Sequence, residues 1–312
     1  MKKYLFVIIC GFILFRLNYL NYYKDIKICI CTIGKKENLY AREFVSFYQN
    51  IGVTKIFIYD NNEKNDEKFD IILNDYIESG FVEIIDYRGI EAPQIKAAEN
   101  CRIQNFKKFD WLIFYDMDEF IFLRNYSNIK DFLKQKIFNK CQRIQLNWIF
   151  HTDNNQLYYE NKTLMDRFPE TDKRWKGIKI GGAEGIKSIL KGNLDFKIHN
   201  IHILNSSLIS CDGFGNIKKV HGIITDKSDH YYYYIDHYWS KSTEEFVNKL
   251  IRGSVALGKN SSIYIRRINM YFNLCDITIE KINYIENKTN VNLTRFKLLL
   301  KNNTKNNTKE LN

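Results

Sequence analysis

The spacing of apolar side chains alternates between two periods over the first 120 residues. Residues 26–33 form an apolar run of strand length. After it, four apolar side chains recur at the i, i+3, i+4, i+7 spacing of one buried helix face: Phe44, Phe47, Tyr48 and Ile51. The alternation continues with predicted strands at residues 53–59, 81–87 and 111–115 and predicted helices at 66–78 and 93–108. Strands that alternate with helices predict an α/β fold with a mostly parallel, doubly wound sheet.

The pattern is less regular after residue 120. Ser127 and the apolar residues after it predict a short capped helix, residues 143–149 predict a strand, and residues 150–235 predict mixed strands and loops. Four consecutive tyrosines at 231–234 are interpreted as a strand with alternately buried rings. Further helices are predicted at 244–257 and 277–285. The polar residues 296–312 are expected to be disordered, because their repeated Lys-Asn-Asn-Thr units bury nothing.

Polar residues follow three of the predicted parallel strands. In such sheets ligands bind beyond the carboxyl ends of the strands. The first strand is followed by the stretch from Thr32 to Glu37, the second ends at Asp60, and the fourth is followed by residues 116–119. The sequence therefore predicts a ligand site built from these three groups, and a carboxylate at Asp60 suits the ribose hydroxyls or base N–H of a nucleotide.

The sharpest motif is Asp116-Met117-Asp118, directly after the fourth strand. A chain turn there brings both carboxylates to one divalent cation, which also takes diphosphate oxygens and neutralises a leaving group. Mg²⁺ and Mn²⁺ suit such oxygen ligands. An isolated Asp-x-Asp is more often a solvated turn, but its place at the end of a nucleotide-type strand favours the metal interpretation. His237, just before the late helix, is a candidate third ligand, and Lys241 a candidate partner for the diphosphate charge.

The amino-acid composition of the chain limits the classes of molecule that it is expected to bind. The chain has 312 residues, 45% of them hydrophobic, and only two prolines, so it can form one large domain or two small ones. A formal charge of +11 favours an anionic partner such as a nucleotide diphosphate or a lipid surface. The basic residues are scattered and no nucleic-acid-binding signature accompanies them, so we expect no nucleic-acid partner. The seven cysteines contain no CxxC pair and are interpreted as buried apolar residues, with one disulfide left open.

The amino terminus predicts a short membrane segment over residues 1–24. Two lysines precede twelve uncharged residues, and no small-x-small cleavage site follows. We expect an uncleaved signal-anchor with a type II topology in the secretory pathway, in the Golgi if the source is eukaryotic; otherwise the protein is expected to be cytoplasmic or membrane-associated. A buried first strand is the alternative. Eight Asn-x-Ser/Thr sequons fit the secretory route, although an Asn-rich chain also produces them by chance.

Four segments together resemble a known family. They are Cys31-Thr-Ile-Gly-Lys-Lys-Glu37-Asn-Leu-Tyr40, Ile58-Tyr-Asp60-Asn-Asn62, Asp116-Met-Asp118-Glu-Phe120 and His237-Tyr-Trp-Ser-Lys-Ser-Thr-Glu-Glu-Phe246. In order and spacing they are similar to glycosyltransferase family 92 and its relatives in the family-2-like GT-A superfamily, over residues 26–295. The resemblance implies a GT-A domain over residues 25–295, with a nucleotide-binding half at 25–125 and an acceptor half at 126–295.

The resemblance also implies a chemistry. It implies transfer of a hexose, galactose above all, from a UDP-sugar to a glycan or glycoprotein acceptor, with manganese and with inversion. Asp116 and Asp118 match the metal motif, Asp60 the nucleotide-contacting acid, and His237 the histidine before the late helix. Lys187, in Ile186-Lys-Ser-Ile-Leu190, also matches a recurring position and is predicted to contact the donor. The resemblance does not identify the catalytic base. The candidate is Glu184, in Gly182-Ala-Glu-Gly185.

Two other functions use the same residues. A nucleotidyl- or phosphoryl-transferring enzyme would also need an Asp-x-Asp, but the chain has no Gly-rich phosphate cradle after its first strand. A membrane-anchored sugar-binding protein could keep the fold without catalysis, but intact Asp116, Asp118 and His237 argue against decay. Hydrolysis of a nucleotide sugar with added metal separates these alternatives.

Overall fold

The computed structural model describes residues 25–171, 185–202, 204–218, 231–253, 256 and 262–309. In this part of the chain the strands form one sheet in the order β3-β2-β1-β4-β7-β6-β10-β5, and a β8–β9 hairpin pairs with β6. The strands of the first half are β1 (Ile28–Gly34), β2 (Lys55–Asp60), β3 (Val82–Asp86) and β4 (Trp111–Ile113). The later strands are β5 (Glu119–Leu123), β6 (Arg143–Phe150), β7 (Ile186–Lys191), β8 (Ser210–Cys211), β9 (Ile217–Lys218) and β10 (Tyr233–His237).

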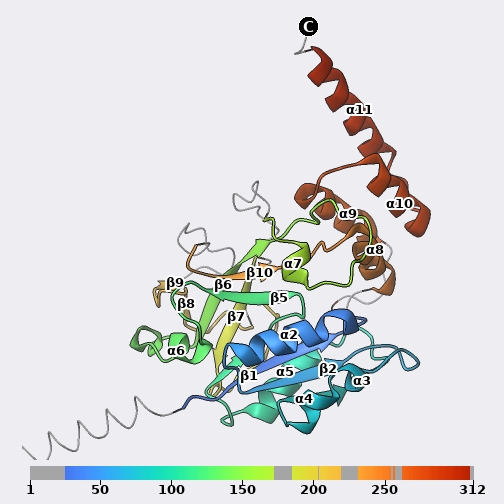
Figure 1. Cartoon of the computed structure of the whole chain (residues 1–312). Coiled ribbons are helices and arrows are strands. Elements are labelled where there is room, and N and C mark those ends of the chain that lie inside the picture. Colours follow the sequence, from blue (N-terminus) through green and yellow to red (C-terminus); the bar gives the residue numbers. More distant parts are fainter. Residues whose placement is uncertain are drawn as a thin grey trace, which may run out of the picture.

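The first half has the predicted doubly wound architecture, with β1 parallel to both β2 and β4 and β2 parallel to β3. Alternate residues of β1 enter different cores. Ile28 and Ile30 pack on the side of helix α2 (Asn38–Asn50), whereas Cys29 and Cys31 face helix α5 (Gln94–Asn105). Short helices α3 (Phe69–Ile72) and α4 (Asn74–Glu78) complete the crossover to β3 (Figure 1). Because helices cover both faces, the strands are apolar on both sides.

The second half of the sheet is mixed, as predicted. β7 is inserted between β4 and β6 and is antiparallel to both, while β10 is parallel to β6 and antiparallel to β5. Helices α6 (Ile129–Leu133) and α7 (Leu164–Arg167) and the 3-10 helix η1 (Lys136–Phe138) lie in its connections. Together with the parallel half, this topology confirms the predicted α/β fold of the GT-A type.

The carboxyl-terminal part is more helical than the pattern predicted. Helix α8 (Thr243–Arg252) ends five residues earlier than expected, at Gly253, whose φ of 82° belongs to the left-handed region. Helix α9 (Ser262–Leu274) was not predicted, and α10 (Ile279–Thr289) is followed by another helix. The cap of α6 is Asn128, whose side chain accepts from the Lys130 N–H, and not Ser127.

The disorder predicted for residues 296–312 is not observed in residues 296–309, the part of this tail that the structure describes. Residues Thr294–Lys309 form helix α11, which extends away from the rest of the molecule (Figure 1). Phe296 is buried and its ring lies 4.7 Å from that of Phe272. Leu300 also packs against the core. The apolar residues just before the polar repeats therefore dock the start of the helix, which composition alone does not reveal.

Four of the buried cysteines are paired. Cys31–Cys101 joins β1 to α5, and Cys141–Cys211 joins the segment that leads into β6 to strand β8. Cys29 and Cys275 are buried free thiols. The predicted burial is observed for the six cysteines that the structure describes, and two disulfides are present where the sequence left one open.

No helix in the ranges that the structure describes is long and apolar enough to cross a membrane. The predicted anchor at residues 1–24 lies outside those ranges and stays a prediction.

Candidate active site

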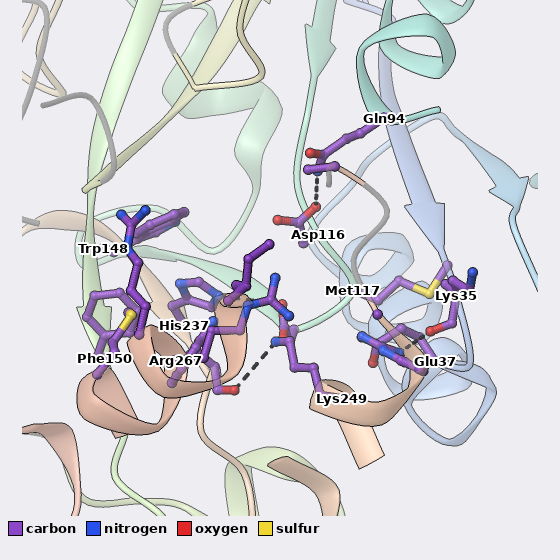
Figure 2. A pocket seen from close by; sticks show the side chains of 18 of the residues that line it. Lys35, Glu37, Gln94, Asp116, Met117, Trp148, Phe150, His237, Lys249 and Arg267 are labelled. Atoms are coloured by element: carbon purple, nitrogen blue, oxygen red, sulfur yellow. Dashed lines mark hydrogen bonds and ion pairs between the residues drawn. The ribbon is translucent and has the colours of Figure 1, made fainter. Parts of the chain in front are cut away.

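A cavity of about 530 Å³ lies beyond the carboxyl ends of β1 and β4. Figure 2 shows Glu37 on one side of it, Trp148 and His237 on the other, and Asp116 and Lys249 between them. Side chains from α8 and α9 complete the lining. A volume of this size suits a small ligand, and its position is the one at which open α/β sheets bind nucleotides.

Asp118 is the most strongly held carboxylate of the cavity. Its Oδ2 atom lies 2.8 Å from Lys249 Nζ and 3.3 Å from Lys241 Nζ, and Oδ1 lies 3.6 Å from His237 Nε2. His237 reaches this place because β10 pairs with β5 in a register that sets His237 opposite Glu119. Burial is the largest influence on the pKa of Asp118 and raises it, but Lys249, Lys241 and His237 together hold the pKa well below its usual range. Asp118 is therefore ionised at neutral pH.

Asp116 is held from behind by Lys187, which is fully buried on β7. The Lys187 ammonium lies 2.8 Å from Asp116 Oδ2 and 3.4 Å from Glu119 Oε2. Burial raises the pKa of Asp116, but Lys187 outweighs it and the net pKa is lowered. Burial raises the pKa of Glu119 well above its usual value despite the same lysine. Lys187 thus keeps Asp116 charged and oriented without lining the cavity itself.

Glu37 connects the first loop to the late helix. Its carboxylate pairs with Lys241 Nζ at 3.1 Å and with the guanidinium of Arg252. Lys241 therefore bridges Glu37 and Asp118. Two of the predicted donor-binding residues, 204 positions apart in the chain, meet in this network. The network closes the cavity on the side of β1.

The donor atoms fit a divalent cation in part. His237 and the less engaged oxygen of Asp118 lie 3.6 Å apart at the cavity wall, a separation that allows both to bind one ion. Burial lowers the pKa of His237, so its imidazole is neutral and can act as a ligand. In the described part of the chain no group of three or more His, Cys, Asp or Glu residues is spaced for a metal ion. Such a partial set suits Mg²⁺ or Mn²⁺, which take few protein ligands when substrate phosphates supply the rest.

Comparison with known proteins decides the family. The model of glycosyltransferase family 92 matches residues 24–252, which is more than half of the chain. The chain belongs to glycosyltransferase family 92. The resemblance seen in the four segments and the prediction of a glycosyltransferase are thereby confirmed at the level of the family.

The relatives of this family 92 chain are distant. A family 92 protein of Ricinus communis is 30% identical over 117 residues, which is 36% of this chain and 20% of that protein. One of Oryza sativa subsp. japonica is 28% identical over 111 residues, 34% of this chain and 18% of that protein. The aligned part of the chain thus spans about a fifth of the length of these plant proteins.

Two solved structures show a weak likeness to the chain. A mannosyltransferase of Pyrobaculum calidifontis, in complex with GDP-mannose and Mn²⁺, has a TM-score of 0.31 and 6% identity over 40% of this chain and 36% of that chain. S. aureus TarS 1–349, in complex with UDP, has a TM-score of 0.38 and 12% identity over 84% of this chain and 79% of that chain.

Two predicted residues of the family 92 site, Thr32 and Asp60, do not line the cavity. Thr32 is buried, and its hydroxyl has no partner among the residues described. Asp60 is buried, accepts from the Asn62 N–H at 2.9 Å and lies 3.8 Å from Arg88. Burial raises the Asp60 pKa despite that arginine. Glu184, the predicted base, lies outside the described residues.

The structure adds residues that the sequence did not single out. Trp148 and Trp239 both line the cavity. Arg267 comes from α9, a helix that the apolar pattern missed, and lines the same cavity (Figure 2). Lys249 was interpreted only as part of a helix. The sequence offered one indication that Lys249 belongs to the site, which is its position eight residues after Lys241 on the polar side of α8.

Proposed function

We propose that this family 92 protein transfers a hexose, galactose above all, from a UDP-sugar to a hydroxyl of a glycan or glycoprotein, with a divalent cation and with inversion. One observation carries the proposal: ionised Asp118 lies between His237 and two lysines at the carboxyl end of a parallel sheet, in a cavity of ligand size. The family supports glycosyl transfer, and the resemblance supports the donor and the metal.

The residues of the cavity provide for both the diphosphate and the sugar of a donor. Asp118 and His237, with Asp116 beside them, would hold the cation, manganese above all and magnesium as the alternative. A bound cation neutralises the negative charge that develops on the departing diphosphate. Lys249 lies at the cavity on the same side and provides a fixed positive charge for that diphosphate. Trp148 lies next to His237, with ring centroids 4.4 Å apart, and offers the cavity a flat apolar surface of the kind on which sugar rings stack.

Replacement of Asp118 by asparagine tests the proposal. The change keeps the shape and removes the charge that binds the cation, so turnover should fall by roughly 10²-fold or more, about 2.7 kcal/mol in activation free energy. The measurement is UDP release from UDP-galactose by the full chain, with Mn²⁺ or with chelator. Wild-type activity should disappear in chelator. His237→Ala should shift the Mn²⁺ concentration needed for half-maximal activity upward.

A matched control is Asp131→Asn, an exposed aspartate on α6 that does not line the cavity. It should keep wild-type turnover. Asp118→Asn with a normal melting temperature and chelator-insensitive, near wild-type turnover would show that the motif is only a turn. Release of UMP and sugar phosphate in place of UDP and free or transferred sugar would identify a nucleotidyl- or phosphoryl-transfer enzyme instead.

A further inference from the structure

His202 presents an open imidazole nitrogen to the same cavity. It follows β7 in the chain and is one of the residues that line the cavity. Its Nδ1 atom lies 3.1 Å from the carbonyl oxygen of Ile186. Because a carbonyl only accepts, Nδ1 carries the proton and Nε2 carries the lone pair. No interaction of Nε2 is found within the part of the chain that the structure describes, so this lone pair is left for a ligand.

The other acidic and basic candidates on the cavity wall are engaged. Of the described lining residues, Glu37, Asp116 and Asp118 are each held by a lysine or arginine at ion-pair distance. His237 faces Asp118 and belongs to the proposed metal set. Among the described carboxylates and imidazoles of this wall, His202 is therefore the one that neither an ion pair nor the proposed cation uses.

Neighbouring residues hold both the imidazole and the backbone of His202 in place. The ring of Trp148 meets the imidazole edge to face, with centroids 5.2 Å apart and an interplanar angle of 83°. The backbone N–H of His202 donates to Asn200 Oδ1 at 2.7 Å, and the backbone carbonyl of His202 accepts from the Ser188 hydroxyl. The indole N–H of Trp148 is buried without a partner among the described residues, although Trp148 lines the cavity. A polar ligand group at this wall would satisfy that N–H.

We propose that His202 is the general base that deprotonates the acceptor hydroxyl. The proposal rests on the proposed glycosyl transfer. As the acceptor oxygen forms its bond to the anomeric carbon, the bond from that carbon to the diphosphate oxygen breaks. The hydroxyl proton passes to Nε2 of His202, and the bonding electrons leave with the nucleoside diphosphate. Trp148 orients the acceptor sugar beside the imidazole.

The charges that face His202 keep it neutral before the donor binds. Burial and the ammonium of Lys187 on β7 lower the pKa of His202 to about 4, with His237 on β10 acting in the same direction and Asp116 opposing them. A neutral imidazole at pH 7 has the lone pair that a base requires. The negative charge of an incoming diphosphate opposes the effect of Lys187, so donor binding raises the pKa of His202 toward the operating pH.

The test compares His202→Gln and His202→Ala with the control His199→Gln in the full chain. His199 lies three residues away on the same segment, is exposed and does not line the cavity. The assay follows UDP release from UDP-galactose with water or with p-nitrophenyl hexosides as acceptors. We expect kcat of both His202 variants to fall by roughly 10²–10⁴-fold, and KM for UDP-galactose to change less than about twofold. Added imidazole should restore part of the activity of His202→Ala, and His199→Gln should match wild type.

The outcomes of these assays decide whether His202 is the general base. Activity of His202→Gln within about threefold of wild type overturns the base assignment, because removal of a general base costs far more. A loss of activity without imidazole rescue, together with weaker UDP binding in calorimetry or a lower melting temperature, shows a structural role and overturns it as well. If the wild-type protein itself releases no UDP from any nucleotide sugar of a panel, the proposed function fails and this inference fails with it. An active wild type with an active His202→Gln refutes this inference alone.

Discussion

Lys187 offers the most direct test of how the site is held together. Its ammonium is fully buried and lies 2.8 Å from Asp116 Oδ2 and 3.4 Å from Glu119 Oε2. Lys187→Met keeps most of the side-chain volume and removes the charge. Asp116 then stays in a partly buried site with no lysine beside it, and Gln94 at 3.4 Å is its remaining side-chain donor among the residues described. The variant should therefore be less stable, in addition to any effect on turnover.

The expected cost follows from the exposure of the two partners. Breaking a buried ion pair by removing one member costs about 3–5 kcal/mol. The Asp116 side chain is 33% exposed, so water screens part of the lost interaction. The cost is therefore expected at the lower end of that range. For a domain of this size about 3 kcal/mol corresponds to a fall in melting temperature of roughly 6 °C. Asp116→Asn in the Lys187→Met background removes the unpaired charge and should recover about 1 kcal/mol or more.

The assay is thermal and urea unfolding of the wild type, both single variants and the double variant. Chelator is present throughout, so that no cation compensates the missing lysine. The double-variant cycle isolates the pair from the rest of the site. Lys187→Met that melts within about 2 °C of wild type would refute the reasoning. So would strictly additive effects of the two substitutions, because an ion pair at 2.8 Å requires coupling.

Two further predictions concern stability away from the cavity. Each disulfide spans a separation of 70 residues, so the chain-entropy model assigns about 4 kcal/mol to each. Reduction of both disulfides should lower the melting temperature by roughly 8 °C or more. If thiol titration shows that the disulfides are reduced and the melting temperature is unchanged, the pairing is contradicted. Phe296→Ala should cost about 3 kcal/mol and expose α11 to trypsin, because Phe296 is only 4% exposed. Leu298→Ala, 54% exposed on the same helix, should change neither the melting nor the cleavage rate.

The fold of the first half could be predicted because its signals are local. A helix face or a strand is recognised from spacings of three, four or two residues, and β1, α2, β2, β3, α5 and β4 all lie where those spacings place them. The prediction was poorer for β5, α9 and α11. β5 follows the Asp-x-Asp turn without a break, and α11 begins in an apolar segment that is too short to stand out before polar repeats.

The sequence by itself determined that the carboxylates of Asp116 and Asp118 lie at the end of β4, since the residues that follow an apolar strand must lie at the edge of the sheet. Only the tertiary structure decided what surrounds them. Lys187, Lys241 and Lys249 come from 71, 123 and 131 residues beyond the carboxylates that they pair with. Lys187 arrives because β7 enters the sheet antiparallel between β4 and β6. Strand order and register depend on packing between distant segments, and no local spacing encodes them.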